Sequence, residues 1–130
     1  MFREVVEMTQ SNKFIILFNL RYYRMRINKQ SFFTIGYPKR IRLLIHPERK
    51  ELVIQPCNKY ETLSFKVPND FNEDNHGFEL NSIKLTEMLA DDIGWDMNKS
   101  YRIYGRYVEK ENVVVFPLNE YEIATQENDL

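Results

Sequence analysis

The chain is poor in the residues that build disulfides, metal sites and phosphate-binding loops. Its 130 residues include one cysteine, two histidines and four glycines. Cys57 has no partner for an internal disulfide, which is typical of proteins of the reducing cytoplasm. One cysteine and two distant histidines do not make a zinc site, and so few glycines leave little room for a glycine-rich phosphate loop. We therefore expect a cytoplasmic protein that holds no metal and no cofactor.

Long apolar runs are also missing. No run approaches the roughly 18 residues that a membrane-spanning helix requires. The longest apolar segment, residues 14–20, already contains Asn19 and is followed by Arg21. The first four residues, Met-Phe-Arg-Glu, lack the charged-then-apolar order of a signal peptide. We predict a protein that has no membrane partner.

Little in the chain resembles catalytic machinery. His46 and His76 each lie in or beside a predicted turn. Nothing near Cys57 in the sequence pairs its thiol with a base, as a nucleophilic cysteine requires. Such a cysteine is more often a small apolar side chain of the core. We predict a binding protein and not an enzyme.

The apolar content is sufficient for one well-packed domain. Hydrophobic residues make up 43% of the chain, with nine Phe and eight Tyr among them. A single domain spanning residues 1–130 would bury about two-thirds of the surface of its unfolded chain. The expected fold class is α+β: a small β-barrel or strongly bent antiparallel sheet, with two short helices.

The predicted elements repeat in one order: strand, helix, hairpin. The first copy, residues 21–57, has a strand over 21–27, a helix over 28–35 and a hairpin of strands 40–46 and 51–55. The second copy, residues 63–118, has strands over 63–67 and 78–80, a helix ending at residue 93, and a hairpin of strands 100–108 and 113–118. One such unit cannot bury its apolar strand faces alone, whereas two units can interleave into a barrel without exposed edges. The acidic tail, residues 119–130, is expected to fray.

Capping residues mark the ends of both predicted helices. Asn28 is placed to cap the first helix through its side-chain oxygen, and Gly36 follows its last turn. Asn81 or Ser82 caps the second helix, which Gly94 ends. The apolar face of the second helix is predicted to consist of Leu85, Met88, Leu89 and Ile93.

The repeat resembles the AbrB-like swapped-hairpin family, whose fold is a cradle-loop barrel. The family pattern is roughly Ile-Pro-Lys-x-x-Arg-x-x-Leu-Gly followed by an alternating hairpin. Ile27, Lys29, Ile35 and Gly36 fall at the corresponding spacing, and Asn28 stands where the family has Pro. The resemblance implies a DNA-binding regulator whose barrel arginines approach DNA. With both units in one chain, either a pseudo-twofold monomer or a homodimer fits. The pattern also resembles small proteins of Gram-positive phages and mobile elements.

Charge is divided unevenly between the two halves. Residues 1–50 carry eleven Lys or Arg against three Glu, a net charge of +8, while residues 51–130 carry seven against sixteen acidic residues, a net charge of −9. The basic half interleaves cations with tyrosines, as nucleic-acid-binding surfaces do. Its predicted nucleic-acid-binding residues are Arg21, Tyr22, Arg24, Arg26, Lys29, Lys39, Arg40 and Arg42. If strands 21–27 and 40–46 pair, Arg24, Arg26, Arg40 and Arg42 would form one cationic plateau.

Two other interpretations of the same charges stay open. The arginines would instead pair with acidic residues of the second half, or cover apolar neighbours with their aliphatic stems. Alternatively, the chain is a phage or mobile-element protein that inhibits a host protein complex, as anti-CRISPR proteins do. In that case an acidic surface would compete for a basic channel by mimicking a phosphate backbone. The residues predicted for this acidic surface are Glu79, Asp91, Asp92 and Asp96, together with Asp70, Glu73 and Asp74 of the connecting loop.

Overall fold

The computed structural model describes residues 13–57, 64–67 and 77–124. In chain order, the elements are β1 (Phe14–Asn19), the 3-10 turn η1 (Leu20–Tyr22), β2 (Arg24–Ile27), α2 (Lys29–Thr34), β3 (Arg40–His46), β4 (Glu51–Cys57), β5 (Ser64–Lys66), β6 (Phe78–Asn81), α3 (Ile83–Ile93), β7 (Ser100–Val108), β8 (Val113–Pro117) and β9 (Tyr121–Ala124).

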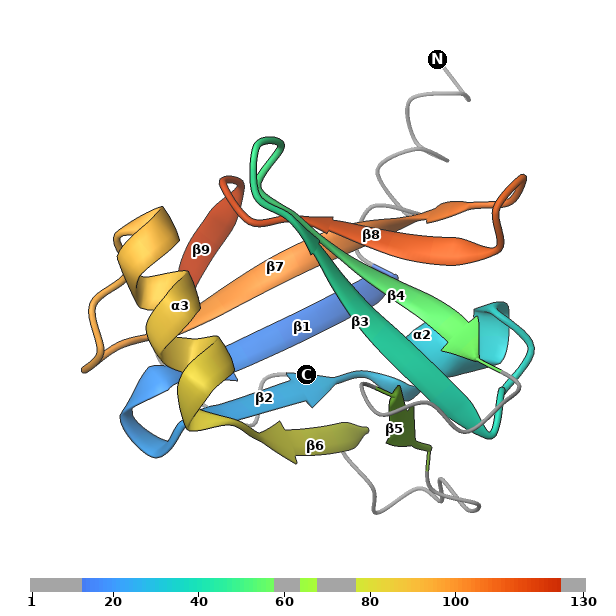
Figure 1. Ribbon diagram of the computed structural model, residues 1–130, viewed down its shortest axis with the longest axis horizontal. Coiled ribbons are helices and arrows are strands. Elements are labelled where there is room, and N and C mark those ends of the chain that lie inside the picture. The colour runs from blue at the N-terminus through green and yellow to red at the C-terminus, as the bar shows by residue number, and fades with distance from the viewer. Residues whose placement is uncertain (1–12, 58–63, 68–76, 125–130) are drawn as a thin grey trace.

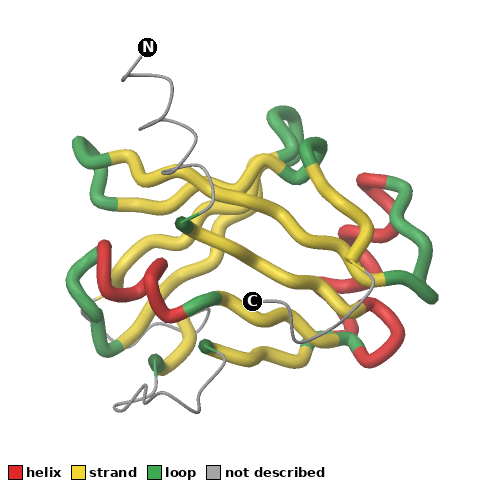
Figure 2. The backbone as a smooth tube through the Cα atoms, turned by 180° about the vertical axis from the view of Figure 1, so that it is seen from behind, coloured by secondary structure: helices red, strands yellow, loops and turns green. Residues whose placement is uncertain are grey.

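All strand pairs are antiparallel, and the sheet is curled into a half-barrel. The strand order is β5-β3-β4-β8-β7-β1-β2-β6, with β9 paired to β7 off this path. The hairpin of β3 and β4 crosses in front of β1 and β7 (Figure 1). The two helices lie at opposite ends of the sheet, as both backbone views show (Figures 1 and 2). The structure thus has the antiparallel, barrel-like α+β architecture that the sequence predicts.

β7 holds the two parts of the sheet together. It pairs with β1 over residues 100–105 and with β8 over residues 106–108. Gly105 lies where the first pairing ends, and a Cβ atom there would approach a ring carbon of Phe116 to 2.7 Å. A glycine within a strand commonly marks such a close approach. After Gly105, β7 changes its partner, so one strand takes part in both parts of the sheet around one core.

The core is filled by one face of each strand. On β1, Phe14, Ile16 and Phe18 are buried and alternate with residues that point to the outer face. Inward residues of the other strands join them with Phe32 of α2 and Leu89 of α3. The largest fully buried side chains are Ile16, Phe18, Leu20, Ile27, Phe32, Ile41, Leu52, Ile54, Leu89, Ile103, Phe116 and Leu118. None of the helices in the described part of the chain has the length and apolar character needed to cross a bilayer.

The predicted caps of α3 are confirmed, and the predicted cap of α2 is wrong. The Ser82 hydroxyl accepts a hydrogen bond from the Leu85 N–H at 3.1 Å, and Gly94 ends α3 with a φ of 85°. The Asn28 side chain does not cap α2. Its oxygen instead accepts the Ile15 N–H of β1 at 3.1 Å, which ties the start of α2 to the start of β1.

Three further predictions are corrected. Residues 21–27 are not one strand, because η1 and the left-handed Tyr23 (φ 55°) reverse the chain between β1 and β2. The acidic tail is not frayed over residues 121–124, which form β9 against β7. Met88 of the predicted apolar face is 39% exposed, while Thr86 is buried in its place.

The loop predicted to connect the two halves spans residues 68–77. Most of it lies outside the described residues.

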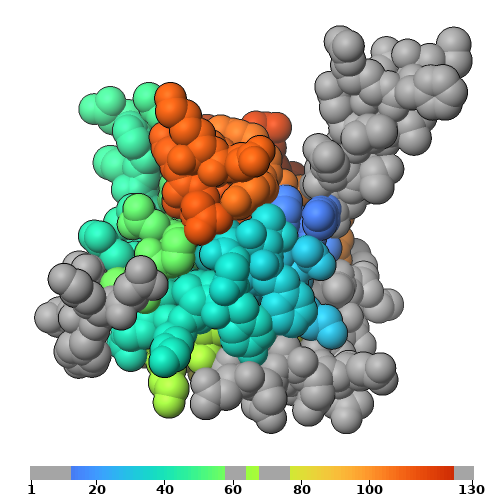
Figure 3. Space-filling model, turned by 90° about the vertical axis from the view of Figure 1, so that its right-hand side faces the viewer, coloured from blue at the N-terminus to red at the C-terminus, as the bar shows by residue number. Residues whose placement is uncertain are grey.

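The turn between β7 and β8 lies directly against the segment around α2 (Figure 3). The Asn112 amide donates a hydrogen bond to the Ile35 carbonyl at 3.2 Å and accepts one from the Tyr107 hydroxyl at 2.8 Å. This contact joins the hairpin of the second half to the end of the helix in the first half.

Two glycines with similar backbone angles provide a test of the packing at β6. Gly36 and Gly77 have φ values of 98° and 104°, but only at Gly77 would a Cβ atom collide, 2.0 Å from the Ile27 carbonyl oxygen. We expect Gly36→Ala to cost about 1 kcal/mol in unfolding free energy, from left-handed strain alone. Gly77→Ala should cost about 2–3 kcal/mol more, because backbone must move. Urea denaturation measures both values, and equal losses would contradict the close packing of β6 on β2.

Candidate nucleic-acid interface

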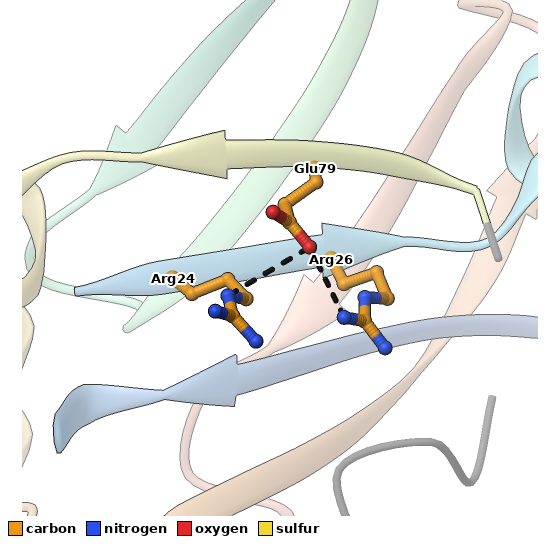
Figure 4. Close-up of polar contacts among 3 residues, drawn as sticks. All are labelled: Arg24, Arg26 and Glu79. Carbon is orange, nitrogen blue, oxygen red and sulfur yellow. Dashed lines mark hydrogen bonds and ion pairs between the residues drawn. The ribbon is translucent and has the colours of Figure 1, made fainter. Parts of the chain in front are cut away.

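Two of the predicted arginines are paired with a carboxylate of the second half. Arg24 and Arg26 point to the outer face of β2, and Glu79 of the adjacent β6 lies beside them (Figure 4). A guanidinium nitrogen of Arg26 is 3.0 Å from Glu79 Oε1, and Arg24 Nε is 3.7 Å from the same oxygen. The side chain of Arg24 is only 29% exposed, and that of Arg26 only 14%. One carboxylate therefore offsets part of the charge of these two arginines within the fold.

The pairing continues across the outer face of the sheet. Strand registers place Glu79, Arg26, Leu17, Arg102 and Glu122 in one row over five neighbouring strands. The guanidinium of Arg102 lies 3.4 Å from the Glu122 carboxylate. Leu17 is 3% exposed although it faces outward, because long aliphatic stems flank it on both sides. The row is thus a balanced ladder of charges around an apolar centre.

The predicted plateau of four arginines does not form. It required β2 to pair with β3, but β2 pairs with β1 and β6, whereas β3 pairs with β4 and β5. The physical reason is the reversal at η1, which folds β2 back onto β1 before the chain reaches α2. Arg40 and Arg42 consequently lie on a different part of the sheet from Arg24 and Arg26.

The second part of the predicted set gathers into a basic surface on β3 and β5. Arg40 and Arg42 share the outer face of β3, and the register places Lys66 of β5 opposite Arg40. Lys39, which precedes β3, is exposed, as is Lys66. The neighbours of Arg40 and Arg42 across the ladders, apart from Lys66, are Gln55, Cys57 and Ser64, none of them acidic. We call Lys39, Arg40, Arg42 and Lys66 the β3–β5 basic surface.

Hydrogen bonds fix the orientation of one arginine in this surface. Arg40 Nε donates to the Ser64 hydroxyl at 2.7 Å, and a terminal nitrogen of Arg40 donates to the Ser64 carbonyl at 3.1 Å. Ser64 is itself buried. The guanidinium is thereby held over the β3–β5 ladder, at the side of the exposed Lys66. A cation positioned in this way loses less rotamer entropy when it contacts an anion.

The remaining predicted cations lie apart from this surface. Lys29 is half-buried in the first turn of α2. Arg21 and Tyr22 belong to η1, where both are exposed and line a small pocket near the start of β7. The Arg24 guanidinium lies over the Tyr22 ring, 5.5 Å from the ring centroid. The predicted nucleic-acid-binding set is therefore divided among four places in the fold.

The predicted acidic surface is also divided. Asp91 and Asp92 at the end of α3 and Asp96 after it are all exposed. Within the described parts of the chain, none of the three aspartates forms an ion pair. Glu79 does not join them, since Arg24 and Arg26 engage its carboxylate. Asp70, Glu73 and Asp74, the loop residues of the same prediction, lie outside the described residues.

The other chemistry-bearing residues in the described part of the chain form no assembled site. Cys57 is buried in β4, and the His46 ring accepts the Arg49 N–H at 3.2 Å within the turn after β3. His76 lies outside the described residues. Among residues 13–57, 64–67 and 77–124, no group of His, Cys, Asp and Glu is placed to hold a metal ion.

Comparison with protein-family models, with characterised proteins and with solved structures found no significant match. The function of the chain is therefore inferred from its own surfaces.

The sequence analysis missed Lys66 as a member of the β3–β5 basic surface, although the predicted strand 63–67 contained a signal for it. Lys66 alternates with the inward-facing Phe65 and Val67, so a period of two already placed its side chain on the outer face.

Glu79 provides a test of the internal neutralisation. We expect Glu79→Gln to lower the unfolding free energy by about 0.5 kcal/mol, a value discounted because the Glu79 side chain is 45% exposed. The loss should shrink as salt rises, because salt screens exposed charges. Glu87→Gln, an exposed position on α3 with no ion pair among the described residues, is the matched control. Equal, salt-independent effects of the two substitutions would argue against pairing.

Proposed function

We propose that this chain is a small, non-enzymatic nucleic-acid-binding protein of the cytoplasm that contacts phosphates through the β3–β5 basic surface. The observation that carries the proposal is the register of β3 with β5, which sets Arg40 opposite Lys66 and Arg42 on the same face. Four cations then lie on one ladder and its edge. Such a cluster binds a phosphate backbone by charge and by release of counterions.

The residue types suit phosphate more than a bare negative charge. A guanidinium offers two parallel N–H donors that match two phosphate oxygens, while a lysine ammonium acts as a mobile point charge. Two arginines flanked by two exposed lysines supply both kinds of contact. Contacts of this kind position a protein on nucleic acid but do not select a base sequence. We therefore propose binding with little sequence preference through this surface.

The paired region around Glu79 is assigned a structural role in this proposal. Arg24 and Arg26 would have to abandon Glu79 to contact phosphate, which opposes their use. The β3–β5 basic surface lies on other strands, and its two lysines are exposed. In AbrB-like proteins, arginines on barrel strands approach DNA. We propose the same for this chain, with the arginines of β3 in this role in place of those of β2.

We also propose that the fold arose from two copies of the strand–helix–hairpin unit. The strands that directly precede the helices of the two units, β2 and β6, pair antiparallel. The last strands of the two units, β4 and β8, also pair antiparallel. Antiparallel pairing of equivalent strands is the pattern that a twofold axis produces. Each helix is followed by a glycine with positive φ, Gly36 and Gly94. An AbrB-like barrel with both units in one chain accounts for these pairings.

Salt-dependent binding tests the proposed surface. We expect Lys39→Gln/Lys66→Gln to reduce the slope of log affinity against log salt by about two, because two phosphate contacts are lost. Fluorescence anisotropy with labelled strands and duplexes of about 20 nucleotides, between about 50 and 200 mM salt, measures the slope. The control is Lys84→Gln/Lys110→Gln, which removes two exposed lysines from α3 and the β7–β8 turn. An unchanged slope in the first variant, or an equal fall in the control, would reject the surface.

A second candidate function is supported by the three exposed aspartates around the end of α3. As a phage or mobile-element protein, the chain would use Asp91, Asp92 and Asp96 to occupy a basic channel of a host complex. The absence of an ion pair to these aspartates within the described residues leaves their charge available to a partner.

Charge reversal distinguishes the second candidate from the first. Replacement of the three aspartates with lysine should abolish capture of a nucleic-acid-handling complex from host lysate by the immobilised protein. Glu109→Lys/Glu111→Lys, in the exposed β7–β8 turn, should leave capture intact. Retained capture by the triple variant would remove this acidic surface from consideration, whatever the result of the DNA titrations.

A further inference from the structure

A small polar pocket lies where β1 ends and β7 begins. Its volume is about 300 Å³, and it lies between η1 and the turn 96–99 that precedes β7. Asn19 of β1 and Ser100 of β7 are register partners, and both line it. Asn19 is a polar side chain that is only 5% exposed. The lining therefore includes a nearly buried polar side chain as well as exposed ones.

The charged residues in the described lining are of one sign. Arg21 and Lys99 contribute two exposed cations, and none of the lining residues that the structure describes is acidic. The larger pocket near Gly105 differs, since its lining mixes Lys13 and Arg106 with two glutamates. A concave site whose described lining offers two cations together with hydroxyl and amide groups is suited to an oxyanion.

Both walls of the pocket are fixed by hydrogen bonds. A guanidinium nitrogen of Arg21 donates to the Asn98 carbonyl at 3.2 Å, and the Leu20 N–H donates to the Lys99 carbonyl at 3.3 Å. The Asp96 carboxylate accepts the Asn98 N–H at 2.8 Å, which holds the turn from within. The two cations are thus presented from turns that are tied to each other. A site already ordered in this way loses less entropy on binding.

An exposed aromatic ring adjoins the cations. Tyr22 lines the pocket with 53% of its surface exposed, and the Arg24 guanidinium lies 5.5 Å from its ring centroid. Ile123 of β9 also lines the pocket and is 54% exposed. Exposed surfaces of this kind next to a phosphate site are suited to a flat nucleobase, which stacks on aromatic side chains regardless of its identity.

We propose that this pocket binds one nucleotide unit by its phosphate group, with the base against Tyr22. Arg21 and Lys99 contact the phosphate oxygens, and Asn19 and Ser100 contribute hydrogen bonds. The site is separate from the β3–β5 basic surface and does not depend on it. A free nucleoside 5′-monophosphate and the phosphorylated end of a strand offer the same chemistry to it.

Calorimetric titration of the full chain with adenosine 5′-monophosphate tests the pocket. Adenosine and inorganic phosphate should each bind at least about tenfold more weakly, because each lacks one half of the recognised unit. The 5′-monophosphates of guanosine, cytidine and uridine should bind within about tenfold of adenosine monophosphate, since stacking tolerates every base. No binding of any of the four nucleotides or of a 5′-phosphorylated oligonucleotide would overturn the proposal.

Variants assign the binding to this pocket. Lys99→Gln should weaken nucleotide binding about tenfold through loss of a charged hydrogen bond. Tyr22→Ala should weaken it similarly, while Tyr22→Phe, which keeps the ring, should not. Lys110→Gln, outside the pocket, and Lys39→Gln/Lys66→Gln, in the other surface, should leave it unchanged. Unchanged affinity in both Lys99→Gln and Tyr22→Ala would place the nucleotide elsewhere.

A competition experiment separates the two sources of the ligand. If a 5′-phosphorylated oligonucleotide displaces adenosine monophosphate and the unphosphorylated one does not, the pocket receives strand ends. If only the mononucleotide binds, the pocket receives free nucleotide. Either result supports a phosphate pocket, and neither depends on whether the β3–β5 basic surface binds nucleic acid.

Discussion

The architecture depends on one strand, β7, being shared between two parts of a single sheet. Over residues 100–105 it pairs with β1, and over residues 106–108 with β8, through which the sheet continues to β4, β3 and β5. The change of partner takes place at Gly105, where the ring of Phe116 fills the space that a side chain would occupy. Through this change of partner, β3 and β5 lie at one end of the strand order, and β2 and β6 lie at the other. This separation also divides the basic residues into independent groups.

Antiparallel register then decides what each group of cations is able to do. On β2, register with β6 brings Glu79 beside Arg26, and the charges cancel within the fold. On β3, register with β5 brings Lys66 beside Arg40, and charges of one sign accumulate. The two arginine pairs have the same spacing in sequence, but different strands lie next to them. A basic stretch is therefore a reliable sign of a binding surface only after its ladder neighbours are known.

Local signals predicted much of the fold. The strands 40–46 and 100–108 have the bounds predicted from alternation and flanking turns, and Ser82 and Gly94 delimit α3 as their capping chemistry requires. The misplaced elements have tertiary causes. Residues 121–124 carry no strong strand pattern, and they become β9 because β7 offers an open edge and Tyr121 packs edge-on against the ring of Trp95 at 5.6 Å. The Asn28 oxygen accepts the Ile15 N–H of β1 and the Ser31 hydroxyl in place of a backbone N–H of α2, since the Ile15 donor lies within reach only in the folded chain.

The sequence by itself determined the elements that can form, the faces of them that are apolar, and the division into a basic and an acidic half, because these follow from short-range backbone preferences and composition. Only the tertiary structure decided which strands pair, and with them which arginines are neutralised and which residues meet in the pocket beside Tyr22. Pairing brings together residues as distant as Arg26 and Glu79 or Arg21 and Asn98. Such contacts form because all the strands pack around one core. A local sequence pattern therefore cannot predict them.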